Sequence, residues 1–193
     1  MVNKNFVRPI DQLIEEHITT IKRIKALRST INQIARIIIS AYQHGKKILV
    51  CGNGGSAADA QHLAAELLGR FEKNRPPLPC LALTTNTSLL TAIANDFSFA
   101  DVFRQQVQAW GKEGDVLIVI STSGNSANIL QAAKIARKQK MTVVGFTGKT
   151  GGRLSSLADV CLKIPSRITA RIQEGHLLAI HILSRLVEEY FFG

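Results

Sequence analysis

The sequence predicts an α/β protein whose parallel sheet is covered by helices on both faces. From residue 46 onward, short apolar runs alternate with segments in which apolar side chains recur every three or four positions. This alternation is typical of strands and helices that follow one another along the chain. The short runs are apolar at successive positions, as expected for strands buried on both faces. Together the two patterns predict a doubly wound sheet.

A helical arm is predicted before the sheet. Residues 10–44 carry apolar side chains at helical spacing, and Asp11 is the expected N-cap. Thr30 and Gln33 have the spacing of a capping box, which predicts a break near residues 28–30 and a second helix after it.

The arm is apolar along much of its length, and a lone helix cannot bury such a stripe by itself. We therefore expect the arm to pack both on the main domain and on a partner subunit. This divides the chain into an N-terminal helical arm, residues 1–45, and an α/β domain, residues 46–193.

The α/β domain contains five predicted strands and five predicted helices. The strands are expected at residues 47–51, 79–83, 116–120, 142–146 and 158–164. The helices are expected at residues 57–70, 87–94, 100–111, 126–138 and 169–190. In doubly wound sheets, ligands bind beyond the carboxyl ends of the strands. The loops in which chemistry is expected are therefore 51–57, 84–88, 121–126 and 147–153.

Composition excludes several classes of protein. The chain has 193 residues and is 46% hydrophobic, which fits one domain with an appendage and excludes disorder over most of its length. It has no apolar run of about 18 residues and no signal-like apolar start, so we expect a cytoplasmic protein. The three cysteines show no CxxC spacing, and they are expected to be buried free thiols.

The net charge of +10 permits nucleic acid, membrane surfaces or small anions as partners. The basic residues are spread along helix faces, without interleaved aromatic residues or a nucleic-acid motif. We therefore expect no membrane or nucleic-acid partner. The excess charge is expected to act as a diffuse field that attracts an anionic substrate.

Residues 121–126, the serine loop, carry four hydroxyl side chains and Gly124 between a strand and the start of a helix. A helix N-terminus offers unpaired N–H groups and a partial positive charge, so this loop is a candidate phosphate site. It lacks the Lys of a nucleotide-binding P-loop. An ordinary serine-rich N-cap turn is the alternative explanation.

Residues 52–56, the glycine loop, follow the first strand and also open a helix. Their three glycines indicate positive φ angles or a close backbone approach. The spacing fits a dinucleotide fingerprint poorly, because Ala57 stands where its last glycine belongs. A second backbone cradle for a polar ligand is the better interpretation.

His62 and Glu66 lie on one face of a predicted helix, where a histidine and a carboxylate can share a metal ion or a proton, whereas Gln173 and His181 on the last helix can only partly converge. His62 and Glu66 are one helical turn apart, and His181 stands in an apolar run eight residues after Gln173, about 80° away around the helix. A solvated pair on the first helix and a satisfied core histidine on the last are the simpler explanations.

Asn95 and Asp96 follow the second strand's loop. Their side chains suit hydrogen bonds to sugar hydroxyls, and they suit equally well a cap between two helices.

Five segments combine into a specific pattern: Gly52–His62, Ala65–Leu67, Ala94–Asp96, Ser121–Ser126 and Arg171–Glu174. This combination resembles the phosphoheptose isomerases, a group within the SIS (sugar isomerase) domain family. The resemblance extends over about residues 10–190. It implies a single SIS domain, a flavodoxin-like three-layer sandwich with a five-stranded parallel sheet. It also implies a homotetramer with active sites at subunit interfaces.

The resemblance also implies roles for individual residues. The phosphate group would be held by Ser121, Thr122, Ser123 and Ser126. The sugar would be contacted by Asn53, Gly54, Gly55, Glu66, Asn95, Asp96 and Gln173. A zinc ion would be held by His62, Glu66, Gln173 and His181. Glu66 would act as the catalytic base and His181 as the acid.

The implied reaction converts sedoheptulose 7-phosphate into D-glycero-D-manno-heptose 7-phosphate through an enediol, the first step toward lipopolysaccharide heptose. Moving a proton between C1 and C2 requires a base near the carbon and an acid near the oxygens, which suits Glu66 and His181.

Two alternatives stay open: a non-catalytic DnaA-binding SIS protein that promotes replication initiation, and a phosphosugar-binding regulator. Glu66 and His181 favour the enzyme. Asn86 and Ala170 depart from the isomerase pattern: many isomerases have Asp at the first position, and some have Asp at the second, where the DnaA-binding proteins have Ala.

Overall fold

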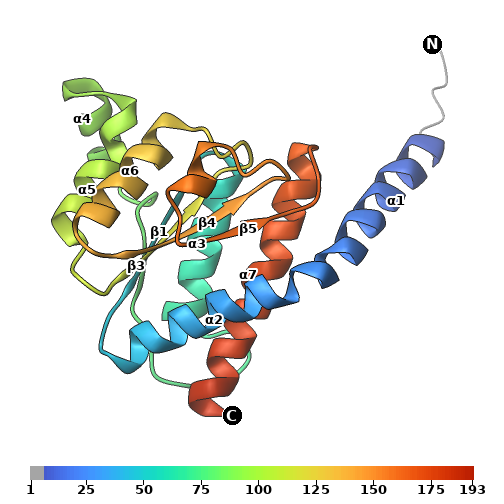
Figure 1. Ribbon diagram of the computed structural model, residues 1–193, viewed down its shortest axis with the longest axis horizontal. Coiled ribbons are helices and arrows are strands. Elements are labelled where there is room, and N and C mark those ends of the chain that lie inside the picture. Colours follow the sequence, from blue (N-terminus) through green and yellow to red (C-terminus); the bar gives the residue numbers. More distant parts are fainter. Residues whose placement is uncertain (1–6) are drawn as a thin grey trace.

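The computed structural model describes residues 7–193, so the start of the predicted arm, residues 1–6, lies outside the described residues. The arm consists of helix α1 (Val7–Ile24), a 3-10 turn η1 (Lys25–Leu27) and helix α2 (Arg28–Gln43). Figure 1 shows α2 lying across the body of the molecule, whereas α1 extends away from it.

Two details of the predicted arm were wrong. Asp11 lies inside α1 and not at its start. The break falls at Lys25–Leu27, so Thr30 and Gln33 lie inside α2 and form no capping box. The physical reason is that the 3-10 turn keeps the backbone helical through the bend, with the Arg28 N–H bonded to the Lys25 carbonyl. The chain therefore changes direction without a side-chain cap.

The five predicted strands form one parallel sheet. The strands are β1 (Ile48–Gly52), β2 (Cys80–Ala82), β3 (Val116–Ile120), β4 (Thr142–Thr147) and β5 (Val160–Lys163). Their order is β2-β1-β3-β4-β5, which is the flavodoxin-like order. The order reverses between β1 and β3, where Gly52 is paired in register with Ile120. A ligand site is expected beyond these two strand ends.

The helices of the domain are α3 (Gly55–Leu68), α4 (Thr87–Asp96), α5 (Val102–Trp110), α6 (Ala127–Lys138) and α7 (Thr169–Phe192). Two further 3-10 turns are η2 (Phe99–Asp101) and η3 (Arg153–Ser156). The five helices were all predicted, with ends that differ by two residues or fewer. The turn η3 was not predicted.

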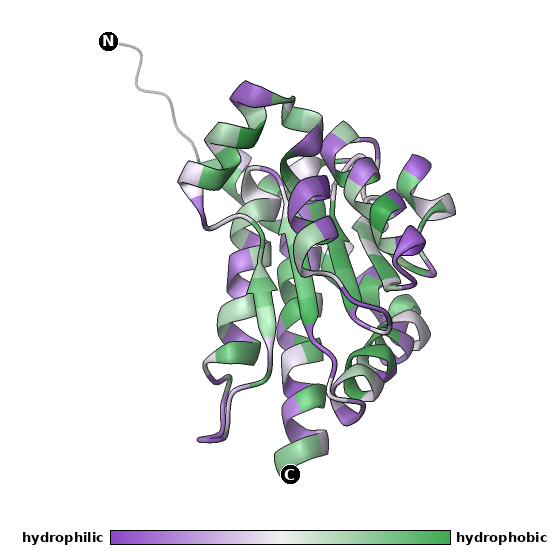
Figure 2. Ribbon diagram, turned by 90° about the vertical axis from the view of Figure 1, so that its left-hand side faces the viewer, coloured by the Kyte–Doolittle hydropathy of each residue, from purple (hydrophilic) through white to green (hydrophobic). Residues whose placement is uncertain are grey.

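The sheet lies between two layers of helices, which confirms the three-layer sandwich. One hydrophobic cluster joins α2, α3 and α7 to strand residues such as Val50 and Ile118. A second cluster joins α4, α5 and α6 to the alternate strand residues, such as Leu49 and Leu117. In Figure 2 the strands at the centre have the green of hydrophobic residues, whereas much of the surrounding helices has the purple of hydrophilic residues. Both faces of the sheet are buried, as the apolar runs predicted.

The cysteines are free thiols, as predicted. Cys51 and Cys80 are buried and Cys161 is half-buried. Burial raises the pKa of Cys80 to about 12, so this thiol stays protonated near neutral pH. Across residues 7–193, no helix is both long and apolar enough to span a membrane.

Candidate active site

The serine loop forms a compact group of hydroxyls at the carboxyl end of β3. The Ser121 Oγ lies 3.1 Å from the Ser126 Oγ and 3.5 Å from the Ser123 Oγ. Ser126 is the N-cap of α6, so the hydroxyls lie at the positive end of that helix. Gly124 has φ +67°, and a Cβ there would lie 2.1 Å from the Gly151 carbonyl oxygen. The backbone therefore requires glycine at this position.

The glycine loop lies beside the serine loop and is tied to the first turn of α6, the helix that the serine loop opens. Asn53 and Asn128 exchange two amide hydrogen bonds, with Nδ2 to Oδ1 distances of 2.9 and 2.8 Å. The Asn128 Oδ1 also accepts from the Ile129 N–H at 2.9 Å, and Asn128 is 2% exposed. Gly54 has φ +55° at the N-cap of α3. The two predicted cradles therefore form one rigid edge of the sheet, across the point where the strand order reverses.

The acid–base cluster comprises His62 and Glu66 on α3 and His181 on α7. The His62 Nε2 lies 2.9 Å from the His181 Nε2 and 3.2 Å from the Glu66 Oε1. The two histidine rings have centroids 5.0 Å apart. Glu66 and His181 both approach the His62 Nε2, so three of the four predicted ligands meet at one atom.

The parallel packing of α3 and α7 brings this cluster together. Gln173, in the second turn of α7, lies against Gly55 at the start of α3, where a Cβ would be 2.4 Å from the Gln173 Nε2. His62 is seven residues beyond Gly55 and His181 is eight beyond Gln173, so both lie about 11 Å farther along their helices. The structure thus places Gln173 beside the glycine loop, about two helical turns before His181 along α7.

Asn95 and Asp96 lie apart from these groups. They form the exposed last turn of α4, where the Asn95 Nδ2 donates to the Asp96 Oδ1 at 2.8 Å. Figure 1 shows α4 on the opposite side of the molecule from α7. Among the described residues, no hydrogen bond joins this pair to the serine loop or to the acid–base cluster.

The donor set of the predicted zinc site fits zinc in kind. Imidazole nitrogens and a carboxylate oxygen are the usual nitrogen and oxygen ligands of this ion, and they approach one another at the His62 Nε2. In the part of the chain that the structure describes, no group of three or more His, Cys, Asp or Glu is arranged as a metal site. Zinc therefore stays a prediction that rests on the family resemblance and agrees with the donor chemistry.

Three residues of this region were not predicted from the sequence. Asn128 follows the serine-rich start of a helix, so in the sequence it looks like one more polar residue of that segment. The Phe71 ring stacks on His181, with centroids 5.8 Å apart and an interplanar angle of 29°. Asp59 is 8% exposed and lies one turn before His62, and burial raises the pKa of its carboxyl to about 6. The signal for Asp59 that the sequence offered was a carboxylate standing among small residues on this helix.

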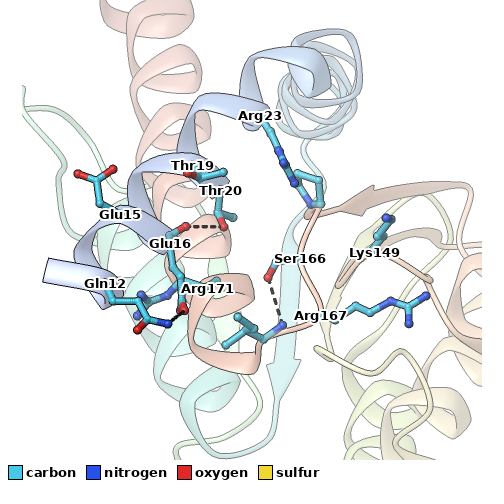
Figure 3. A pocket seen from close by; sticks show the side chains of 12 residues that line it. Gln12, Glu15, Glu16, Thr19, Thr20, Arg23, Lys149, Ser166, Arg167 and Arg171 are labelled. Carbon is cyan, nitrogen blue, oxygen red and sulfur yellow. Dashed lines mark hydrogen bonds between the residues drawn. The ribbon is translucent and has the colours of Figure 1, made fainter. Parts of the chain in front are cut away.

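The cavity in Figure 3, about 560 Å³ in volume, lies elsewhere, between α1 and the start of α7. Its lining includes Arg171, whose guanidinium donates to the Leu13 carbonyl and to the Glu174 Oε1. The Glu174 Oε2 in turn lies 2.7 Å from the His17 Nδ1. These contacts hold α1 against α7. None of the predicted site residues lines this cavity.

Comparison with known proteins agrees with this geometry. A family model described as the SIS domain matches residues 12–148. A phosphoheptose isomerase from Shewanella denitrificans is 49% identical over 185 residues, 94% of each chain. Another from Aneurinibacillus thermoaerophilus is 54% identical over 162 residues, covering 84% of this chain and 82% of that protein. The chain belongs to the phosphoheptose isomerase family.

A solved phosphoheptose isomerase structure from Neisseria gonorrhoeae superimposes with a TM-score of 0.91 at 42% identity, covering 96% of this chain and all of that one. Membership of this family confirms the resemblance that the combined motifs indicated. The five-stranded parallel sheet and the long N-terminal helix are those expected of a phosphoheptose isomerase SIS domain.

The two departures from the phosphoheptose isomerase pattern have simple structural settings. Asn86 is the N-cap of α4, and its Oδ1 accepts from the Leu89 N–H at 3.0 Å. Asp in that position would make the same bond, so the exchange leaves the cap intact. Ala170 lies exposed in the first turn of α7, where it makes no contact that forms the acid–base cluster.

Proposed function

We propose that the protein isomerises sedoheptulose 7-phosphate to D-glycero-D-manno-heptose 7-phosphate in the cytoplasm, as the first step of heptose precursor synthesis. The observation that carries this proposal is the meeting of His62, Glu66 and His181 in a chain whose relatives are phosphoheptose isomerases. A carboxylate and an imidazole held side by side suit ketose–aldose exchange, in which a proton moves between adjacent carbons.

The serine loop would hold the phosphate of the substrate. The Ser121 Oγ lies within 3.5 Å of the Oγ atoms of Ser123 and of Ser126, and the N-terminus of α6 adds a partial positive charge. Thr122 adds a fourth hydroxyl, while its carbonyl accepts from the Gly148 N–H at 2.9 Å. Because the loop contains no Lys or Arg, specificity for phosphate would come from hydroxyls and backbone N–H groups.

Proton transfer would be divided between Glu66 and His181. Glu66 removes the proton from C1 while His181 donates a proton to the carbonyl oxygen on C2, which gives the enediol. His181 then takes the proton from the hydroxyl on C1 as Glu66 returns a proton to C2, which gives the aldose. Each residue ends the cycle in its starting state, so one base and one acid are enough.

A zinc ion is part of the proposal: it would be held by His62, Glu66 and His181, which meet in the structure. Gln173, the fourth ligand that the resemblance implies, lies against Gly55 and would have to turn toward the ion to bind it. When bound, such an ion would polarise the substrate's oxygens and organise the site. Metal analysis of the purified protein, beside the variant His62→Ala, tests this point without reference to activity. We expect about one zinc per chain in the parent and a loss of zinc in the variant.

The proposed assembly is a homotetramer with its active sites at subunit interfaces. Ile10, Leu13 and Ile14 on α1 are each more than half exposed in the single chain, at 51%, 54% and 51%. Exposed apolar groups on one helix face are typical of a surface that a partner covers. Sedimentation of the purified protein gives the number of chains in the assembly.

The function is tested by incubating the purified protein with sedoheptulose 7-phosphate and following the sugar by proton NMR. The proposal expects an aldose anomeric signal that grows with time and with the amount of protein. If folded protein at high concentration leaves the ketose unchanged, the proposed function is wrong.

A further inference from the structure

A buried ion pair lies at the far end of the α3–α7 contact, beyond the acid–base cluster. Glu188 on α7 and Arg75, in the segment between α3 and β2, have side chains that are 3% and 1% exposed. The Arg75 Nε donates to the Glu188 Oε1 at 3.0 Å. Neither residue contacts the serine loop or the glycine loop, so phosphate binding gives no reason for this pair.

Glu188 organises the backbone of the segment that follows α3. Its carboxylate accepts from the N–H groups of Phe71, Glu72 and Lys73 at 3.2, 2.8 and 2.9 Å. Burial acts to raise the pKa of this carboxyl, but the hydrogen bonds from Glu72, Lys73, Arg75 and Phe71 outweigh it and hold the pKa below its ordinary value. Glu188 is thus a charged acceptor around which residues 71–75 are wrapped.

Arg75 connects the same segment to the helix that carries two members of the cluster. Its Nη2 donates to the Glu66 carbonyl at 2.7 Å and its Nη1 to the Leu67 carbonyl at 2.8 Å. These carbonyls lie in the last turn of α3 and lack partners within the helix. The guanidinium therefore fixes the end of α3 at the residue proposed as the catalytic base.

Phe71 connects the segment to the second helix of the cluster. Its N–H is held by Glu188, and its ring stacks on His181, 5.8 Å between centroids. Two bonded paths thus lead from the ion pair to the acid–base cluster, one through the Glu66 backbone and one through the Phe71 ring.

We infer that Glu188 and Arg75 are positioning residues for the isomerase reaction, which hold Phe71 against His181 and the end of α3 beneath Glu66. The inference rests on the proposed function for what His181 and Glu66 do, and on the contacts above for how they are held. Small displacements of catalytic groups reduce turnover more than they reduce substrate binding when the phosphate is held elsewhere.

The kinetic test compares Phe71→Leu, Glu188→Gln and the double variant. We expect each single variant to lower kcat by about tenfold and to change KM less than about twofold, because the serine loop is untouched. We expect the double variant to be about as slow as the slower single one, because the path through Phe71 is one of the two paths that Glu188 supports. Phe191→Leu is the matched control, since its ring packs on Tyr42, Tyr190 and Phe192.

A second readout requires no substrate. The ring current of a stacked Phe71 shifts the proton resonances of the His181 imidazole, and at fixed pH these should move alike in Phe71→Leu and Glu188→Gln. If the parent protein fails to isomerise but these shifts occur, the proposed function fails while the positioning contact stands.

The inference is overturned if Glu188→Gln lowers the thermal midpoint yet retains parental kcat and His181 resonances, or if the kinetic effects multiply in the double variant. Should Glu188→Gln fail to fold, Arg75→Lys replaces it, because lysine keeps the charge but lacks the planar fork that reaches two carbonyls at once. The same losses are then expected, and parental kcat would equally overturn the inference.

Discussion

The serine loop and the acid–base cluster are built in opposite ways. The serine loop is six consecutive residues whose hydroxyls meet because one tight turn leads into a helix. In the acid–base cluster, His62 and His181 are separated by 119 residues and meet because α3 and α7 run side by side in register. A binding element can thus be local in sequence, whereas the reactive groups depend on tertiary packing. Substitutions in the two regions should have different kinetic consequences.

The largest effect is expected from the reactive groups. Glu66→Gln and His181→Gln retain size and polarity but remove the proposed base and acid, so kcat should fall by roughly 10²- to 10⁴-fold. KM should change little, because the serine loop is intact. Steady-state kinetics with sedoheptulose 7-phosphate measure both constants, and near-parental turnover in either variant would exclude that residue from proton transfer.

The contrast also explains which features could be predicted from the sequence. The strands, the helices and both loops were predictable, because apolar runs and Gly or Ser punctuation are local signals. The contact between His62 and His181 was not, since two positions on separate helices converge only if those helices are neighbours with matched starting points. Thr30 and Gln33 have the spacing of a capping box. The 3-10 turn before them keeps the backbone helical, so no free helix start is present at that point.

Glu188 and Asn128 illustrate the same limit in polar residues. Each looks like a surface residue in its own helix, yet each is 2% exposed and paired with a distant segment. The resemblance to the family supplied the roles of residues for which spacing alone left alternatives open.

His176 tests how tightly α7 is packed on the sheet between the levels of the two regions. It lies on α7, fully buried, with its Nε2 3.2 Å from the carbonyl oxygen of Thr147 at the end of β4. Burial lowers the pKa of His176 to about 4, whereas an unfolded histidine titrates near 6.5. The folded state therefore binds this proton less well, so its stability is complete above about pH 6.5 and is lost as the pH falls toward 4.

We expect this group to account for about 3 kcal/mol of lost stability between pH 7 and 4. Urea unfolding at fixed protein concentration, at pH 7 and at pH 4, measures it in the parent and in His176→Leu. The variant should lose less stability than the parent over this interval. An identical loss in both would show that folding does not lower the pKa of His176.

Removal of one hydroxyl from the serine loop should affect binding. Ser123→Ala deletes a hydroxyl that would bond to a charged phosphate, so KM should rise about tenfold or somewhat more while kcat stays within about twofold. A fall in kcat as large as that in Glu66→Gln would show that the serine loop takes part in the chemical step.

The smallest effects distinguish two glycines with similar backbone angles. Gly45 and Gly124 have φ +66° and +67°, but a Cβ meets nothing within 4 Å at Gly45 and lies 2.1 Å from the Gly151 oxygen at Gly124. Gly45→Ala should cost about 1 kcal/mol of stability and leave KM unchanged. Gly124→Ala should cost more and raise KM, because the serine loop must move. Thermal unfolding and kinetics on both variants measure the difference, and equal effects would contradict it.

The division between binding and chemistry is tested most directly by one experiment at saturating sedoheptulose 7-phosphate. Proton NMR follows aldose formation by the parent, Ser123→Ala and Glu66→Gln side by side. We predict that the parent and Ser123→Ala form aldose at similar rates, and that Glu66→Gln forms it at least a hundred times more slowly. Turnover by Glu66→Gln at the parental rate, or a loss in Ser123→Ala that no substrate concentration restores, would contradict the division.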